Sequence, residues 1–169
     1  MLNEMILSGT VCMKSAWSSA VEYLIRYSSD NTVPPLKCIS DDATYRIGDT
    51  VLLQGQLMYL YGCFVLFTDV IHRVSSASYN SVRLVGKRVG EDEERKEILL
   101  RVDSARQINA IPENLLRIQL WDSVFEIYQT RKEEVELIGI AGSFDHDKVK
   151  AERVSFLSVQ NEEENTQVS

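Results

Sequence analysis

A faint internal duplication limits the folds that this chain can adopt. Residues 5–11 resemble residues 82–88, and residues 49–55 resemble residues 133–139. Each segment is an apolar run that carries a glycine, and a glycine inside a strand usually marks a bulge or a tight barrel corner. These glycines are Gly9, Gly86, Gly55 and Gly139. The duplication therefore predicts two copies of one small β unit.

Short runs rich in Val, Ile, Leu, Tyr and Phe, separated by polar clusters, predict strands along most of the chain. In the first copy the predicted strands are 4–12, 20–27, 36–40, 50–60 and 63–74. In the second copy they are 81–89, 97–103, 115–121, 134–141 and 148–158. Both copies thus have five strands, and we expect an all-β protein.

The spacing of the copies predicts one additional element in the second. The offset is 77 residues at Gly9 and Gly86 but 84 at Gly55 and Gly139, which implies seven inserted residues. Segment 122–129 accounts for them as a short helix, since it begins with an N-cap candidate and continues with apolar residues at helical spacing. The expected units are 1–76, 77–160 and an acidic flexible tail, 161–169.

Composition places the chain in an ordinary class. Its 169 residues are 44% hydrophobic and 25% charged, as expected for a globular protein with a sizeable core. No stretch reaches the roughly 18 apolar residues of a membrane span, and the start lacks the basic region of a signal peptide. We therefore expect an intracellular, cytoplasmic protein without a membrane partner.

Motifs for catalysis and for metals are missing from the sequence. The three cysteines match no C-x-x-C pattern, and His72 and His146 lie far apart, so no metal or other cofactor is expected. Phosphate-binding loops and hydrolase motifs are also absent, which argues against an enzyme. Residues 145–147 (Asp-His-Asp) are interpreted as a hairpin turn, with a proton relay as the weaker alternative.

The charge distribution differs between the copies. The formal charge of −7 lowers the expectation of nucleic-acid binding, although phosphate contacts depend on where the cations lie. Residues 81–160 hold 13 of the 18 basic residues. If one copy contacts a polyanion, the second is the better candidate.

Several short motifs resemble a known family. Residues 7–11 and 83–87 resemble the opening strand of bacterial single-stranded DNA-binding proteins and of the related primosomal replication protein. Residues 48–55 are similar to that family's fourth strand, and residues 151–157 to its closing strand. The resemblance implies two tandem OB-folds, which are five-stranded Greek-key barrels, with a short helix in the second.

The same resemblance implies an assembly and a set of partners. Family members with two units per chain form dimers of four barrels, so a homodimer is implied, with replication or repair proteins as further partners. Family tails end in an apolar tip, whereas the acidic run 162–164 is followed here by polar residues. Recruitment of partners through that tail is therefore not expected.

OB-folds bind single strands on the face of strands two and three and on nearby loops. Alternation along the strands of the second copy places Leu84, Leu100 and Ile118 inward and the intervening cations outward. The resulting candidate nucleic-acid-binding residues are Arg83, Lys87, Arg101, Arg117 and Trp121. The competing interpretation is that each cation is a solvated residue paired with Glu97, Asp103 or Glu136.

The first copy supplies aromatic residues with little charge. The candidates here are Lys14 and Arg26, Trp17 in the first predicted loop, and Tyr61 in the last hairpin. Tyr23 and Tyr27 share one face of a strand, and we expect that face in a subunit interface, with the barrel core as the alternative.

Two functions follow from these observations. The first is a non-catalytic single-stranded DNA-binding protein in replication, repair or plasmid maintenance, with RNA as an alternative ligand. The second is a tandem OB-fold protein-interaction scaffold that has lost nucleic-acid binding. The acidic balance favours the scaffold, whereas the resemblance and the basic face of the second copy favour the binder.

Overall fold

A computed structural model describes residues 2–76, 78–102 and 113–157, with ten strands and one helix. We refer to 2–76 as the first half and to 78–157 as the second half. The first half contains β1 (Asn3–Trp17), β2 (Ala20–Arg26), β3 (Leu36–Ser40), β4 (Thr50–Leu60) and β5 (Cys63–Arg73). The second contains β6 (Asn80–Asp92), β7 (Glu97–Arg101), β8 (Leu115–Leu120), α1 (Asp122–Arg131), β9 (Leu137–Asp145) and β10 (Lys148–Leu157).

Every predicted strand is present, and so is the short helix. The helix begins directly after Trp121 and buries Val124, Phe125 and Tyr128, the apolar positions that predicted it. The predicted turn is present: Asp145 ends β9, and His146 and Asp147 form the turn with φ of 50° and 57°. The predicted acidic tail and Asp103 lie outside the described residues, and the boundary between residues 76 and 77 stays a prediction.

The strands of the first half form a closed barrel. β2 pairs with β3, β3 with β5, β5 with β4, and β4 with β1, which returns to β2. All these pairs are antiparallel except β3 with β5. Alternate residues such as Leu7, Leu53 and Ile25 point inward and are fully buried, because a period of two sends every second side chain to the core.

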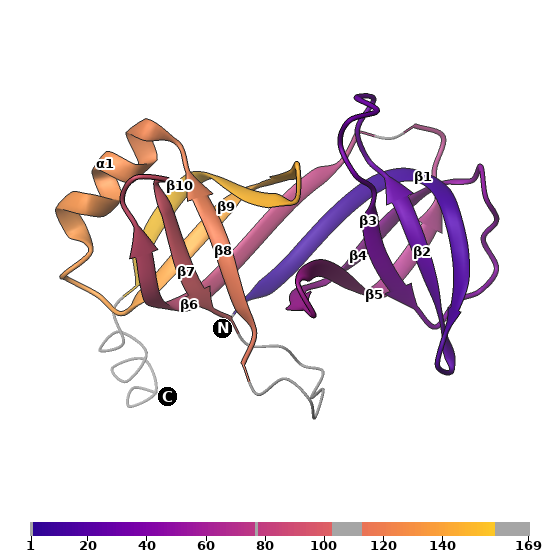
Figure 1. Ribbon diagram of the computed structural model, residues 1–169, viewed down its shortest axis with the longest axis horizontal. Coiled ribbons are helices and arrows are strands. Elements are labelled where there is room, and N and C mark those ends of the chain that lie inside the picture. Colours follow the sequence, from indigo (N-terminus) through magenta and orange to yellow (C-terminus); the bar gives the residue numbers. More distant parts are fainter. Residues whose placement is uncertain (1, 77, 103–112, 158–169) are drawn as a thin grey trace, which may run out of the picture.

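The second half repeats this order of pairing. β6 pairs with β7, β7 with β8, β8 with β10 and β10 with β9, which pairs with β6. The parallel pair is again that of the third and fifth strands, here β8 and β10. Figure 1 shows the two sets side by side, with β1 and β6 running between them and α1 at the outer end.

Antiparallel pairing of β1 with β6 joins the halves. Asn3 pairs with Leu84, and Leu7 pairs with Asn80. Since positions 77 residues apart are equivalent in the two copies, the second pair is the first with the halves exchanged. The junction therefore has a local two-fold pseudo-symmetry, and the buried side chains of both halves form one continuous core.

Two asparagine side chains, one in each half, make equivalent hydrogen bonds in addition to the pairing of the strands. The Asn3 side chain donates a hydrogen bond to the Leu57 carbonyl and accepts one from its N–H, both at 2.9 Å. Asn80 makes the same two bonds with Phe144, at 2.7 and 2.8 Å. Asn3 of β1 thus satisfies both backbone groups of Leu57 on β4, and Asn80 of β6 satisfies those of Phe144 on β9. Leu57 and Phe144 therefore occupy equivalent places.

These contacts correct the alignment of the copies. Leu57 and Phe144 are 87 residues apart, so Gly55 corresponds to Gly142 and the predicted match with Gly139 is wrong. A Cβ atom at Gly55 or Gly142 would lie 1.9 Å from the backbone oxygen of Phe67 or Lys150. At Gly139 the nearest atom would be a side-chain carbon 3.3 Å away. The second copy therefore has ten additional residues up to its fourth strand, three more than the sequence comparison implied.

Candidate nucleic-acid interface

The outer face of β7 and β8 is the place where the sequence predicted binding. Ile98 and Leu100 of β7 enter the core, so Glu97 and Leu99 lie on the opposite face. Across the strand pair, Glu97 faces Gln119 and Leu99 faces Arg117. The predicted inward and outward positions on these strands are confirmed.

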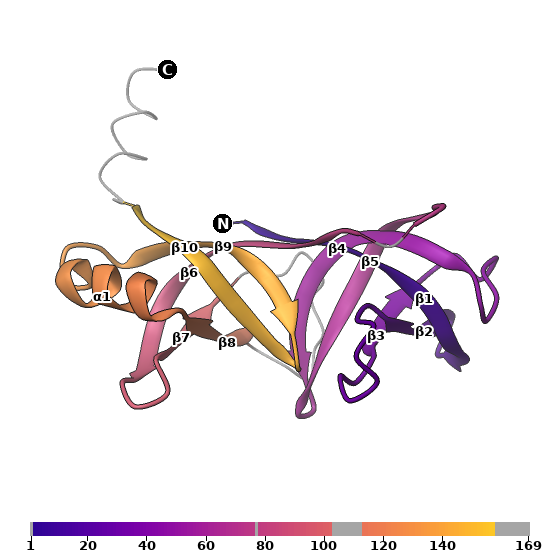
Figure 2. The same cartoon turned by 90° about the horizontal axis from the view of Figure 1, so that it is seen from above.

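A hollow of about 390 Å³ lies over this face and is walled by hairpins from both halves. The β4–β5 hairpin contributes Tyr59 and Phe64, and the β9–β10 hairpin contributes Asp147 and Lys148. Figure 2 shows these two hairpins converging at the middle of the molecule. The remaining lining residues are Arg95, Glu97, Leu99, Leu115, Arg117 and Gln119.

Tyr59 is held in place by other aromatic rings. It meets the Phe64 ring edge-on at a centroid distance of 5.0 Å, and Phe64 meets Phe144 of the second half in the same way at 5.2 Å. The Tyr59 side chain remains 42% exposed, whereas Phe64 and Phe144 are buried. An exposed ring on a rigid aromatic support is a suitable platform for stacking a base.

The cations of the hollow converge on one carboxylate. Arg117 Nε lies 3.6 Å and Lys148 Nζ lies 3.8 Å from the Glu97 carboxylate oxygens. The Glu97 side chain is only 6% exposed, against 64% for Arg117 and 49% for Lys148. The charged groups of Arg117 and Lys148 are thus exposed to solvent, whereas the Glu97 carboxylate beneath them is buried.

A second hollow, of about 580 Å³, adjoins the first and shares Arg95 and Gln119 with it. Its lining adds Lys96, Trp121 and Lys150. The Trp121 side chain is 56% exposed. Lys150 is paired with Asp145 at 3.1 Å, and Lys96 is paired with Asp122. We call the two hollows together the β7–β8 track: it runs from Tyr59 to Trp121.

The structure brings only part of the predicted set together. Arg117 and Trp121 line the track. Arg101 is paired with Glu113 at 3.1 Å, and its cross-strand neighbour Lys87 is paired with Glu136 at 3.7 Å. The pairs of Lys87 with Glu136 and of Arg117 with Glu97 match the competing interpretation of solvated, paired cations. Arg101 is paired too, but with Glu113, which was not among the predicted partners.

Two of the predicted cations of β6 lie away from the track. Lys87 lines a separate hollow beside the residues that follow α1. Arg83 lies on the part of β6 that pairs with β1 and β9, so it does not share the β7–β8 face. A binding role for Arg83, Lys87 and Arg101 stays a prediction.

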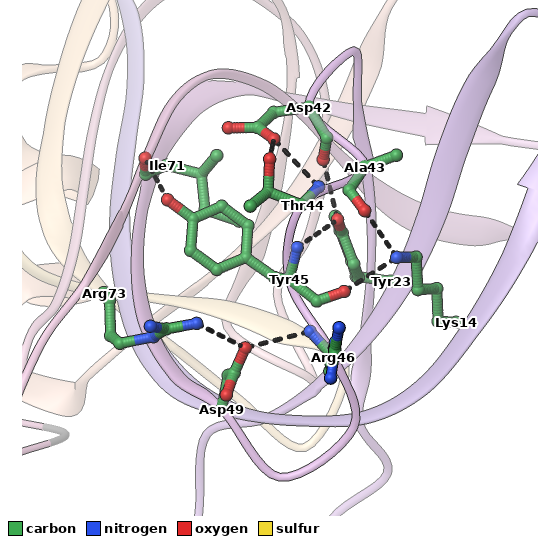
Figure 3. A network of polar contacts seen from close by, with 10 residues as sticks. All are labelled: Lys14, Tyr23, Asp42, Ala43, Thr44, Tyr45, Arg46, Asp49, Ile71 and Arg73. Atoms are coloured by element: carbon green, nitrogen blue, oxygen red, sulfur yellow. Dashed lines mark hydrogen bonds and ion pairs between the residues drawn. The ribbon is translucent and has the colours of Figure 1, made fainter.

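In the first half, Lys14 has a structural role (Figure 3). Its ammonium group donates hydrogen bonds to the carbonyls of Ala43 and Tyr45, at 2.5 and 2.8 Å, and so holds the loop between β3 and β4. In the same network the Tyr23 hydroxyl donates to the Asp42 carbonyl at 2.6 Å. Lys14 is therefore engaged in holding its own barrel.

The expected subunit-interface role of Tyr23 is wrong, because its side chain is fully buried in the barrel core beside Ile25. Tyr27 packs against that core and meets the Phe144 ring at 5.6 Å. Burial raises the pKa of Tyr27 to about 12. The barrel core, which was the alternative, is therefore the better account of both tyrosines.

The remaining candidates of the first half also lie outside the track. Trp17 is the last residue of β1 rather than a loop residue, and its ring meets Phe67 at 6.0 Å. Tyr61, at the tip of the β4–β5 hairpin, is 82% exposed but does not line either hollow. Arg26, at the end of β2, is half-buried. Their binding roles stay predictions.

Sequence reasoning missed the cations that the hairpins contribute. Lys148 and Lys150 alternate with the buried residues Val149 and Ala151 along β10, so an alternation signal was present in the sequence. Arg95 lies in the turn between β6 and β7. Nothing in the sequence indicates that Tyr59 of the first half lies over a strand of the second.

Within the described ranges, no group of three or more His, Cys, Asp or Glu side chains could hold a metal ion. No helix of the described chain has the length and apolarity needed to cross a membrane.

Comparison with known proteins yields a match in structure alone. No family model matches the sequence, and no curated protein matches it. Among the solved structures that match is a deletion mutant of the single-stranded DNA-binding protein from Thermus aquaticus. The two chains share 15% identity at a TM-score of 0.62, over 92% of this chain and 94% of the other. The likeness shows the fold: an all-β protein with a closed five-stranded barrel of the OB type and one short helix.

Proposed function

We propose that this chain is a non-catalytic single-stranded DNA-binding protein that acts in replication, repair or plasmid maintenance. The observation that carries the proposal is the β7–β8 track, where exposed cations lie between two exposed aromatic rings, Tyr59 and Trp121. Cations release counterions from the phosphate backbone, and aromatic rings stack on unpaired bases. The likeness to a single-stranded DNA-binding protein supports the same ligand class.

Single strands suit this track better than a duplex does. Stacking on Tyr59 or Trp121 requires the flat face of a base, which a duplex covers by stacking of neighbouring pairs. The hairpins that wall the first hollow also restrict access to a space of about 390 Å³. A flexible strand can thread one unpaired base at a time into such a space. RNA remains an alternative ligand, because it differs only in its sugar contacts.

We further propose that the second half is a second OB-fold unit, which makes the chain a tandem protein. The matched order of strand pairing, the parallel pair at equivalent strands and the paired asparagine contacts support this. Both first strands also bulge at equivalent positions, after Val11 in β1 and after Arg88 in β6.

A protein-interaction scaffold is the second candidate. The net charge of −7 supports it, since an acidic protein repels DNA at long range. The pairing of Arg101 and Lys87 with carboxylates supports it too, because cations that are already paired attract phosphate less. Under this function the track would hold a segment of a partner protein.

Titration separates the two functions. The protein is mixed with unstructured oligothymidine or with duplex at low and moderate salt while tryptophan fluorescence is followed. Quenching by the single strand, with an affinity that falls steeply as salt rises, is the expected result. Absence of any fluorescence change or mobility shift with the single strand at low salt would refute single-stranded DNA binding and leave the scaffold function.

The assembly is proposed to be a homodimer with four barrels, as the family resemblance implies, and replication or repair proteins are its proposed partners. Light scattering at several protein concentrations tests the dimer directly. A mass of 19.2 kDa at all concentrations would contradict the homodimer without bearing on the ligand.

A further inference from the structure

Glu97 has an unusual position for an acidic residue on a nucleic-acid-binding face. It lies at the floor of the first hollow of the β7–β8 track, with its side chain 6% exposed. Its two carboxylate oxygens face different cations, Oε2 towards Arg117 of β8 and Oε1 towards Lys148 of β10. One covered negative charge is thus shared by the two cations.

The first half contains the equivalent residue, Glu22, four positions before Arg26 as Glu97 is before Arg101. Among the described residues, Glu22 is paired with one cation, Lys37 at 3.2 Å, and accepts a hydrogen bond from the Ser15 hydroxyl at 2.9 Å. A carboxylate at this place is therefore common to both halves. Only the second half adds the lysine of the last hairpin.

The geometry constrains what Glu97 does when a strand enters. A phosphate that binds Arg117 or Lys148 takes the place of a carboxylate that is already there, and the two anions repel each other. Because Glu97 lies at the floor of a walled hollow, solvent screens this repulsion less than it would on an open surface. The carboxylate cannot leave, since β7 carries it and the hairpins cover it.

We propose that Glu97 is a built-in competitor for phosphate, which lowers the affinity of the β7–β8 track for single-stranded nucleic acid and so permits release. The inference rests on the proposed function, since it concerns the strength of that same site. Glu97 occupies both cations while the track is empty. Each phosphate that binds must draw Arg117 or Lys148 away from this carboxylate, which stays in place.

Glu97→Gln tests the inference, since glutamine keeps the size and removes the charge. Oligothymidine binding is measured for the whole protein over a series of salt concentrations, after thermal unfolding has shown that the variant is folded. We expect the dissociation constant to fall about fivefold at low salt. The slope of log affinity against log salt should become more negative by about 0.7 for each side chain, Arg117 or Lys148, that the substitution frees to bind a phosphate.

Glu22→Gln is the matched control, because it removes the equivalent carboxylate from the half that has no such track. Its affinity and salt slope should equal those of the wild type. Glu97→Asp is the second variant, which keeps the charge but withdraws it by one methylene. It should bind with an intermediate affinity, and it replaces Glu97→Gln if that variant does not fold.

The outcomes separate this inference from the proposed function. A wild type that binds no single strand would refute the function itself. A wild type that binds, with a folded Glu97→Gln of equal or weaker affinity or of unchanged salt slope, would overturn only the role of Glu97. A folded Glu97→Asp that binds no tighter than the wild type would overturn it equally.

Discussion

The outer faces of β2–β3 and β7–β8 occupy equivalent places in the two halves, yet one is filled and the other is open. Over β3, Ile39 is buried in a separate apolar cluster with Met58, Leu60, Val65 and Phe67 of the β4–β5 hairpin. At the position equivalent to Ile39, the second half has the polar Gln119, which lines the track.

The β4–β5 hairpin accounts for this difference. From Gly55 to its bulge partner Thr68 it spans four residues more than the β9–β10 hairpin does from Gly142 to Ala151. One side of the longer hairpin covers its own barrel, and Tyr59 on the other side walls the hollow of the neighbouring half. The β4–β5 hairpin thus covers the β2–β3 face of its own half and contributes Tyr59 to the β7–β8 face of the other half.

The equivalence of the two scaffolds is tested by the largest expected effect. Gly55→Ala and Gly142→Ala should each lower the free energy of unfolding by about 3 kcal/mol or more, because the new Cβ would strike a backbone oxygen. Gly139→Ala should cost about 1 kcal/mol or less, since the Cβ of Ser155, 3.3 Å away, must shift only slightly. Urea unfolding measures all three. An equal loss of unfolding free energy at Gly139 and Gly142 would instead favour the alignment of Gly55 with Gly139.

The difference between the faces is tested next. Arg117→Ala combined with Trp121→Ala should weaken oligothymidine binding about 100-fold at low salt, through one lost phosphate contact and one lost stacking interaction. Lys37→Ala, at the position of the first half equivalent to Arg117, should change the affinity less than twofold. Fluorescence anisotropy of a labelled oligonucleotide gives both values. Equal losses would mean that both faces bind.

The contribution of the first half to the track has a smaller expected effect. Tyr59→Ala should weaken binding about tenfold with an unchanged salt slope, because a stacked base is worth about 1–3 kcal/mol and carries no counterion. Tyr61→Ala, on the same hairpin but outside the hollow, is the matched comparison and should weaken binding less than Tyr59→Ala does. A larger loss for Tyr61 would place the strand across the hairpin tip.

Tyrosine ionisation gives the smallest effect. Burial raises the pKa of Tyr27 in the first half and of Tyr128 in the second to about 12, above their ordinary value of about 10. Their contribution to stability is therefore complete below pH 10 and is lost as the pH rises through 12, since only the unfolded chain ionises readily.

At pH 11 each tyrosine should have lost about 1 kcal/mol of the free energy of unfolding. Tyr128→Phe should lessen the decline between pH 9 and 11 by about 1 kcal/mol. The parts due to Tyr27, Tyr23 and Cys38 should remain, because burial raises the pKa of each of these groups as well. Denaturant unfolding at the two pH values measures it. An unchanged decline would show that Tyr128 ionises equally in both states.

The strands and the helix could be predicted because their signals are local. Alternation identifies Leu100 and Ile118 as inward, and the spacing of Val124, Phe125 and Tyr128 identifies α1. Alignment of the fourth strands could not be predicted in this way. The backbone contact that requires Gly142 involves Lys150 of another strand, and Gly139 lies in an equally apolar run.

Only part of the site could be predicted, because only some of its residues are marked by local signals. Arg117 and Trp121 lie on the strand face that the fold class uses, so alternation was sufficient to find them. Tyr59 and Lys148 reach the track from two hairpins whose meeting depends on the packing of Phe64 against Phe144 across the halves. Tyr23 was misassigned because alternation defines a face without telling which face is the core.

The pseudo-symmetric pairing of β1 with β6 has a further consequence for how such a protein can change. Two identical chains joined in this way would separate on dilution, and every substitution would appear on both faces at once. Here one chain provides both strands, so dilution does not separate them and each half can mutate alone. That independence permits a difference such as the one seen here, where one hairpin covers its own barrel and the equivalent face of the other half stays open.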